Sequence, residues 1–210
     1  MADPHEATKT DDRLLIQIAS YNTNLQGDQG LPQNLVDWLS PTLQVSRFLS
    51  KLNRAPDIVA VGFQELLPLH HARTLILPLY AGLSLSKFLL VSGLSASVIE
   101  NRNTHILSQI NTIVPNNDSY ALVAKVVNVG VALLVYALDG GVGRKVRDVQ
   151  TQWAGCGPGY MGNKGAVGVR FRVADKDDDP GEIFTYVSYC RPPSRRLISS
   201  LASQGSSVLT

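Results

Sequence analysis

The sequence predicts an α/β fold, a layered sandwich built around a mixed β-sheet. Short apolar segments alternate with amphipathic segments in the first half of the chain, whereas strand patterns outnumber helical patterns in the second half. The 210 residues are 44% hydrophobic and 17% charged. That composition is typical of a globular domain large enough to bury a substantial core. We see no internal repeat.

The first three predicted elements are a strand, a helix and a strand. Residues 13–20 are rich in leucine and isoleucine and predict a buried strand. Ser40 and Pro41 resemble a helix N-cap followed by proline at the first helical position, so we predict a helix that ends near residue 53. Residues 57–62 are almost wholly apolar and predict a second buried strand.

A second helix and a set of antiparallel strands are predicted next. Residues 95–114 place isoleucines on one helical face. Residues 120–138 are too long for one strand, and we expect a break near Gly130. Residues 145–153 alternate as a strand does, and residues 165–173 and 182–188 predict a hairpin across the acidic turn 175–181.

Three segments fall outside this pattern. Residues 1–12 are polar, without the apolar region of a secretory signal, and we expect a flexible N-terminus. Residues 74–94 approach the length of a membrane span, but Pro78 and Lys87 interrupt them, so we predict an insertion and no transmembrane span. Residues 189–210 are rich in arginine, proline and serine and form an off-pattern tail.

Cysteine usage and charge narrow the class of protein. Cys156 and Cys190 match no zinc motif and no disulfide framework, so we expect free thiols in a reducing compartment. The formal net charge is only +2, and three arginines lie within residues 191–210. The body of the chain therefore lacks the basic excess that nucleic-acid binding normally requires.

The segment GYMGNKG at residues 159–165 predicts a phosphate-facing loop. Gly162 and Gly165 allow a sharp turn and close approach of the backbone to a ligand. Lys164 supplies a positive charge suited to phosphate, and Asn163 can donate and accept hydrogen bonds. The alternative interpretation is a glycine-rich hairpin turn with an exposed lysine.

Two predicted strands end in residues that could hold a metal ion. Asn22 follows the first strand, and Glu65 follows the strand of residues 57–62. Mg²⁺ prefers oxygen ligands and often takes one or two carboxylates together with waters and phosphate. The alternatives are a turn residue for Asn22 and a helix-start acid for Glu65.

Taken in order, three motifs resemble one family. A strand followed by YNTN, then PDIVAVGFQE and then GYMGNKGAVGVRF resemble the catalytic domain of the inositol polyphosphate 5-phosphatases. That family belongs to the deoxyribonuclease-I-like endonuclease/exonuclease/phosphatase superfamily. The resemblance covers residues 14–187 apart from the predicted insertion. It implies an incomplete deoxyribonuclease-I-like sandwich over residues 13–188.

The resemblance also implies roles for the motif residues. Asn22 and Glu65 match positions in the family's Mg²⁺ site, and Asn163 and Lys164 match positions that face the phosphorylated inositol ring. The implied reaction is hydrolysis of the ring's 5-phosphate by an activated water. The implied partners are inositol phosphates or phosphoinositide head groups, and the implied location is the cytoplasm, including the surface of membranes.

The chain departs from the family after residue 187. A histidine motif is due there, but the sequence continues with Ser-Tyr-Cys-Arg-Pro-Pro. The family's Gly-Asp-x-Asn and later Asp and His motifs are absent, and the chain's four histidines do not match their positions (His5, His70, His71 and His105). The catalytic set is incomplete, so we expect an inactive or nearly inactive chain. The alternative is a non-catalytic fragment that binds phosphoinositide or a protein partner, and a nuclease is less favoured.

Two further expectations follow from the departure. One hypothesis is that residues 74–94 and 189–210 derive from an intron or a shifted frame, and sequencing the transcript across both junctions tests it. The other is that half a sandwich exposes apolar faces and unpaired strand edges, giving poor solubility or a need for a partner.

Overall fold

The computed structural model describes six stretches of the chain, namely residues 13–23, 54–66, 85–112, 114, 118–156 and 164–190. Several predictions from the sequence lie outside these residues. They are the flexible N-terminus 1–12, the helix of residues 40–53, residues 74–84 of the predicted insertion, residues 159–163 of the glycine-rich loop, and residues 191–210 of the tail.

The described strands form two sheets. The first sheet has the order β1-β2-β4-β3, with β1 Ile16–Asn22, β2 Ile58–Gln64, β4 Val131–Leu138 and β3 Tyr120–Asn128. Its β1 and β2 are parallel, and its other pairs are antiparallel. The second sheet is antiparallel with the order β5-β6-β7, from β5 Val146–Gly155, β6 Gly165–Val173 and β7 Glu182–Cys190. The predicted layered sandwich with a mixed sheet is confirmed.

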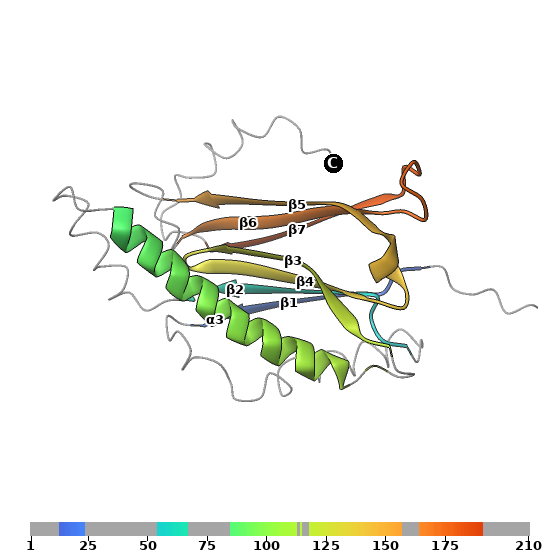
Figure 1. Ribbon diagram of the computed structural model, residues 1–210, viewed down its shortest axis with the longest axis horizontal. Coiled ribbons are helices and arrows are strands. Elements are labelled where there is room, and N and C mark those ends of the chain that lie inside the picture. The colour runs from blue at the N-terminus through green and yellow to red at the C-terminus, as the bar shows by residue number, and fades with distance from the viewer. Residues whose placement is uncertain are drawn as a thin grey trace, which may run out of the picture.

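The first sheet is the middle layer of the molecule. Helix α3, Leu85–Asn111, runs diagonally across one face, and the second sheet lies against the other (Figure 1). Successive residues of β2 therefore enter different cores. Val59, Val61 and Phe63 face the helix, whereas Ile58 and Ala60 face the second sheet. Burial on both faces explains why this segment is almost wholly apolar.

Polar contacts hold α3 against the sheet at specific positions. The hydroxyl of Tyr136 donates to Asn103 Oδ1 at 3.0 Å, and burial raises the pKa of Tyr136. The guanidinium of Arg102 lies 5.0 Å from the centre of the Phe63 ring, a cation–π contact in a fully buried setting. The hydroxyl of Ser95 donates to the carbonyl of Val129 at 3.0 Å.

The predicted second helix is longer at its start than expected. It begins at Leu85 instead of residue 95 and ends at Asn111 instead of residue 114. It therefore includes part of the apolar segment and passes through Gly93. A single glycine in a helix costs only about 1 kcal/mol, so Gly93 does not by itself end the helix.

The strands form as predicted, with shifted ends, but the first of them is not buried as expected. Strand β1 ends its sheet, and Gln17 is its one buried residue. Residues 120–138 divide into β3 and β4 around a turn at Val129 and Gly130, as predicted. The strand predicted from residue 145 begins at Val146, after a short 3₁₀ turn over Val142–Lys145. The predicted hairpin is formed by β6 and β7, and β7 continues beyond residue 188 because Tyr189 and Cys190 still pair with β6.

One side of the sandwich is open within the described residues. Strand β1 ends the first sheet on that side, and β7 ends the second sheet. Four large apolar side chains on these two strands are well exposed, at 66% for Ile18, 56% for Ile183, 61% for Val187 and 67% for Tyr189. The expected exposed apolar surface and unpaired edges are therefore present. None of the described helices is long and apolar enough to cross a membrane.

The close approach of the two sheets at Gly62 is testable by adding a methyl group. A Cβ at Gly62 would lie 2.8 Å from Ser188 Oγ and 3.0 Å from Ser188 Cβ, so Gly62→Ala forces the sheets apart locally. We expect a loss of about 1–3 kcal/mol in the free energy of unfolding, measured by urea denaturation. Gly168→Ala is the matched control, since its Cβ meets nothing closer than 3.6 Å. Equal effects of the two substitutions would contradict the prediction.

Candidate functional site

Glu65 is the first residue after β2, and its backbone conformation is unusual. Its φ angle of 55° lies in the left-handed region, which non-glycine residues rarely adopt. Contacts on both sides hold it there. The Thr23 hydroxyl donates to the Glu65 carbonyl, and the Leu66 amide donates to the carbonyl of Gly130 at 3.2 Å. Strain of this kind costs about 1–3 kcal/mol and is often found at functional sites.

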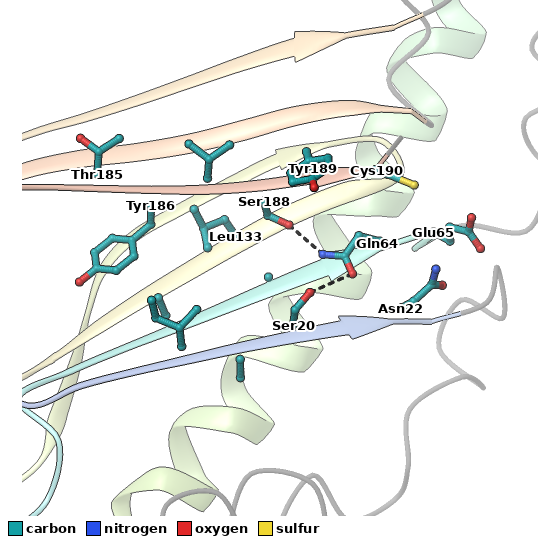
Figure 2. Close-up of a pocket in the computed structure, with 15 residues that line it drawn as sticks. Ser20, Asn22, Gln64, Glu65, Leu133, Thr185, Tyr186, Ser188, Tyr189 and Cys190 are labelled. Carbon is teal, nitrogen blue, oxygen red and sulfur yellow. Dashed lines mark hydrogen bonds between the residues drawn. The ribbon is translucent and has the colours of Figure 1, made fainter. Parts of the chain in front are cut away.

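Asn22 lies beside Glu65 because β1 and β2 are parallel. Asn22 pairs with Gln64 at the last position of both strands, and the Thr23 amide donates to the Gln64 carbonyl at 2.9 Å. The carboxyl ends of the two strands therefore meet at one edge of the sheet. The side chains of Asn22 and Glu65 lie close together at that edge (Figure 2).

A cleft of about 600 Å³ runs from this edge between the open sides of the two sheets. Asn22 and Glu65 lie at one end of it, and β1, β2 and β7 supply most of its lining (Figure 2). The lining combines small apolar side chains with hydroxyl groups, among them Ser20, Thr185 and Ser188. The cleft is therefore an open groove of mixed polarity, with polar side chains at one end.

Gln64 connects the two sheets across this cleft. Its carbonyl oxygen accepts from the hydroxyl of Ser20 at 3.2 Å, and its amide nitrogen donates to Ser188 Oγ at 3.0 Å (Figure 2). Ser188 is buried, and Gly62 beside it has no side chain to block it. These two hydrogen bonds join β1, β2 and β7 next to Glu65.

Lys164 brings a positive charge to the same place from the second sheet. Its ammonium nitrogen lies 2.6 Å from Glu65 Oε1 and 3.1 Å from Cys190 Sγ. Desolvation opposes the charged form, but hydrogen bonds to Glu65 and Cys190 outweigh it and raise the pKa of Lys164. The Cys156 amide also donates to the Lys164 carbonyl at 2.7 Å, which fixes the backbone at the start of β6.

The structure brings together three of the four site residues predicted from the sequence, since Asn163 lies outside the described residues. The structure gives a further reason for glycine at position 165. A Cβ there would lie 2.2 Å from the Ala154 carbonyl, so glycine is required by the neighbouring strand β5. The sequence analysis missed Gln64 and Cys190. Extending the predicted hairpin by two residues would have placed Cys190 opposite Gly165, beside Lys164.

The oxygen donors at this edge fit a hard divalent cation. Glu65 offers a carboxylate and Asn22 an amide carbonyl, and a cation already contacts that carboxylate in the form of the Lys164 ammonium. The described residues contain no cluster of three or more His, Cys, Asp or Glu side chains that could hold a metal ion. Among the described residues, Glu65 and Asn22 therefore supply the protein oxygens at this edge that a bound cation could use.

Comparison with solved structures supports the fold. The inositol polyphosphate 5-phosphatase domain of SPsynaptojanin, solved in complex with inositol (1,4)-bisphosphate and calcium ion, matches with a TM-score of 0.60 and 19% sequence identity. The match covers 89% of this chain but only 42% of that one, so this chain spans less than half of that domain. At this identity the likeness concerns the fold alone.

Other matches add less. A point mutant of Cimex nitrophorin in its ferrous NO complex matches with a TM-score of 0.49 and 14% identity, over 86% of this chain and 48% of that one. That level of similarity supports no functional argument. No curated protein matches the chain.

The sequence itself matches a family model over residues 19–188, which include most of β1, the Glu65 segment, Lys164 and most of β7. The match confirms the superfamily predicted from the three motifs, and the fold comparison agrees with the predicted likeness to a 5-phosphatase domain. The chain belongs to the endonuclease/exonuclease/phosphatase family 2.

Proposed function

We propose that this chain is the metal- and phosphate-binding part of an inositol polyphosphate 5-phosphatase domain. The observation that carries the proposal is the meeting of three chemically suited groups where β1 and β2 end, two of them lining the cleft and the third paired with Glu65. They are the carboxylate of Glu65, the amide of Asn22 and the ammonium of Lys164. Each comes from a different strand or loop, so their meeting depends on the fold.

The three groups are suited to bind a metal ion and the phosphate group that the ion contacts. Glu65 and Asn22 would hold Mg²⁺ through oxygen atoms, and the bound ion supplies charge stabilisation to phosphoryl oxygens. Lys164 would bind a phosphate oxygen through a charge-assisted hydrogen bond. We propose that Asn163, its neighbour in sequence, contacts the inositol ring.

The proposed ligand is an inositol phosphate or a phosphoinositide head group. Two observations favour it over nucleic acid. The chain's net charge is only +2, and the fold matches a domain that was crystallised with inositol (1,4)-bisphosphate. We further propose that the chain works in the cytoplasm, including at membrane surfaces, where phosphoinositide head groups are exposed.

We propose that this chain binds its ligand without cleaving it efficiently. Hydrolysis requires a group that activates the attacking water and others that position it. Among the described residues the only histidine is His105, which lies on α3. That helix packs on one face of the first sheet, and the second sheet lies on the other (Figure 1). Because the cleft lies between the two sheets, the first sheet separates His105 from it.

Metal binding by Glu65 is the first prediction of this proposal. Glu65→Ala removes the one carboxylate that the described residues place at the cleft end, and we expect the affinity for Mg²⁺ to fall by more than about tenfold. Isothermal titration calorimetry of the full chain with MgCl₂ measures it. Asp175→Ala is the control, because that carboxylate pairs with Lys145 in the β6–β7 turn. An unchanged affinity in Glu65→Ala would remove Glu65 from the site.

Phosphate binding without turnover is the second prediction. With saturating Mg²⁺, we expect the chain to bind a soluble inositol trisphosphate, and Lys164→Met to weaken that binding about tenfold or more through loss of a charge-assisted hydrogen bond. Calorimetry measures the binding, and a phosphate-release assay measures turnover. Vesicles with and without a phosphoinositide form a second arm that separates lipid from soluble ligands. Turnover well above that of Glu65→Ala would show that the chain is a complete enzyme.

A further inference from the structure

We propose that the Lys164 ammonium occupies the position beside Glu65 that a metal ion would take. When a divalent cation binds there, Lys164 leaves Glu65 and becomes available to bind phosphate. The inference rests on the proposed function and adds an order of binding to it, with the cation before the phosphate. It is based on the observation that the Glu65 carboxylate could bind either of two cations. Glu65 is the anionic partner of Lys164, and among the described residues it is also the one carboxylate available to a metal at the end of the cleft.

The contact between Lys164 and Glu65 is short and partly protected from solvent. The ammonium nitrogen lies 2.6 Å from Oε1, and the two side chains are 24% and 21% exposed. A divalent cation on this carboxylate would lie within a few ångströms of the ammonium. At such separations like charges repel strongly in a partly buried site, so the two cations compete for Glu65.

The Lys164 side chain can also leave Glu65 while its backbone stays beside the site. Its backbone stays in place because its carbonyl accepts from the Cys156 amide at 2.7 Å. Its side chain is a flexible four-carbon stem that can swing its charge by several ångströms. Among the described residues, the other contact of the ammonium is Cys190 Sγ at 3.1 Å, and a thiol sulfur is a weak acceptor.

An incoming phosphate is therefore the strongest alternative partner for a displaced Lys164. Phosphate oxygens are anionic and accept charge-assisted hydrogen bonds, which are about twice as strong as neutral ones. Before the cation binds, the Glu65 carboxylate repels phosphate and is paired with the Lys164 ammonium. After it binds, the carboxylate is neutralised and Lys164 is available. Binding of a cation and of phosphate should thus be positively coupled.

The proposal predicts that removing Lys164 changes the two affinities in opposite directions. Lys164→Met should raise the affinity for Mg²⁺ by about fivefold, as expected for loss of a competing ion pair, although it lowers the affinity for phosphate. If Lys164 only bound phosphate, Mg²⁺ affinity would not change. If Lys164 positioned Glu65 for the metal, Mg²⁺ affinity would fall.

The experiment is a calorimetric titration of the full chain with MgCl₂ alone, without phosphate. The variants are Lys164→Met, Lys164→Arg and Lys145→Met. Lys164→Arg keeps the charge and should not raise the affinity. Lys145→Met removes the same charge from the pair with Asp175, where nitrogen and oxygen are 2.7 Å apart, and should also leave the affinity unchanged. A rise confined to Lys164→Met supports the proposal, and an unchanged or lower affinity in that variant overturns it.

A second readout follows Lys164 itself in the unaltered protein. Nuclear magnetic resonance of the lysine ammonium groups, assigned with Lys164→Arg, should show the Lys164 signal shifting as Mg²⁺ saturates the chain. The Lys145 signal should stay in place. A Lys164 signal that Mg²⁺ does not move overturns the inference even if Glu65→Ala abolishes Mg²⁺ binding, and that pattern leaves the proposed function intact. Absence of any Mg²⁺ binding by the unaltered chain overturns both.

Discussion

Burial of β2 on both faces is the constraint on which the rest of this structure depends. Helix α3 covers one face of that strand and the second sheet covers the other, while β1 and β4 pair with its two edges. Such a strand can present polar chemistry only where it ends. Gln64 and Glu65 stand at that end, the first pointing into the cleft and the second held in a left-handed conformation. The site is therefore located by a strand that is buried on both faces, and precise functional sites are generally supported by such well-packed elements.

The same constraint explains why the second sheet reaches the site. Gly62 leaves room for Ser188, and Ser188 accepts a hydrogen bond from Gln64, so β7 is drawn to the end of β2. The hairpin partner of β7 is β6, whose first residue follows Lys164. A side chain 99 positions away from Glu65 thus arrives within ion-pair distance of it. The ion pair between Lys164 and Glu65 therefore forms because the two sheets pack together, and not because the two residues are near each other in the sequence.

The sequence predicts the elements well because their patterns are local. Apolar runs at β2 and β4, the break near Gly130 and the β6–β7 hairpin all follow from residue spacing within one or two elements. The site is predicted only where a motif carries it. Glu65 and Lys164 come from such motifs, but their contact does not, since it depends on how two sheets pack. Cys190 and Ser188 belong to no motif, and their roles come from hairpin register and from the space beside Gly62. The first turns of α3, from Leu85, lie in the segment that was predicted to be an insertion, so they were not predicted as helix.

The open side of the sandwich governs how strong the charge contact at the site can be. Lys164 and Glu65 are each about one-fifth to one-quarter exposed, and the cleft beside them opens between β1 and β7. Water in that cleft raises the local dielectric constant and weakens the ion pair, which makes it easier for a cation to displace Lys164. Any polypeptide or membrane that covered Ile18, Val187 and Tyr189 would remove this water. Covering would strengthen the pair and also every attraction between Lys164 and phosphate. Covering the exposed apolar side chains would therefore change the strength of the ion pair by excluding solvent, without any hydrogen bond between the two groups.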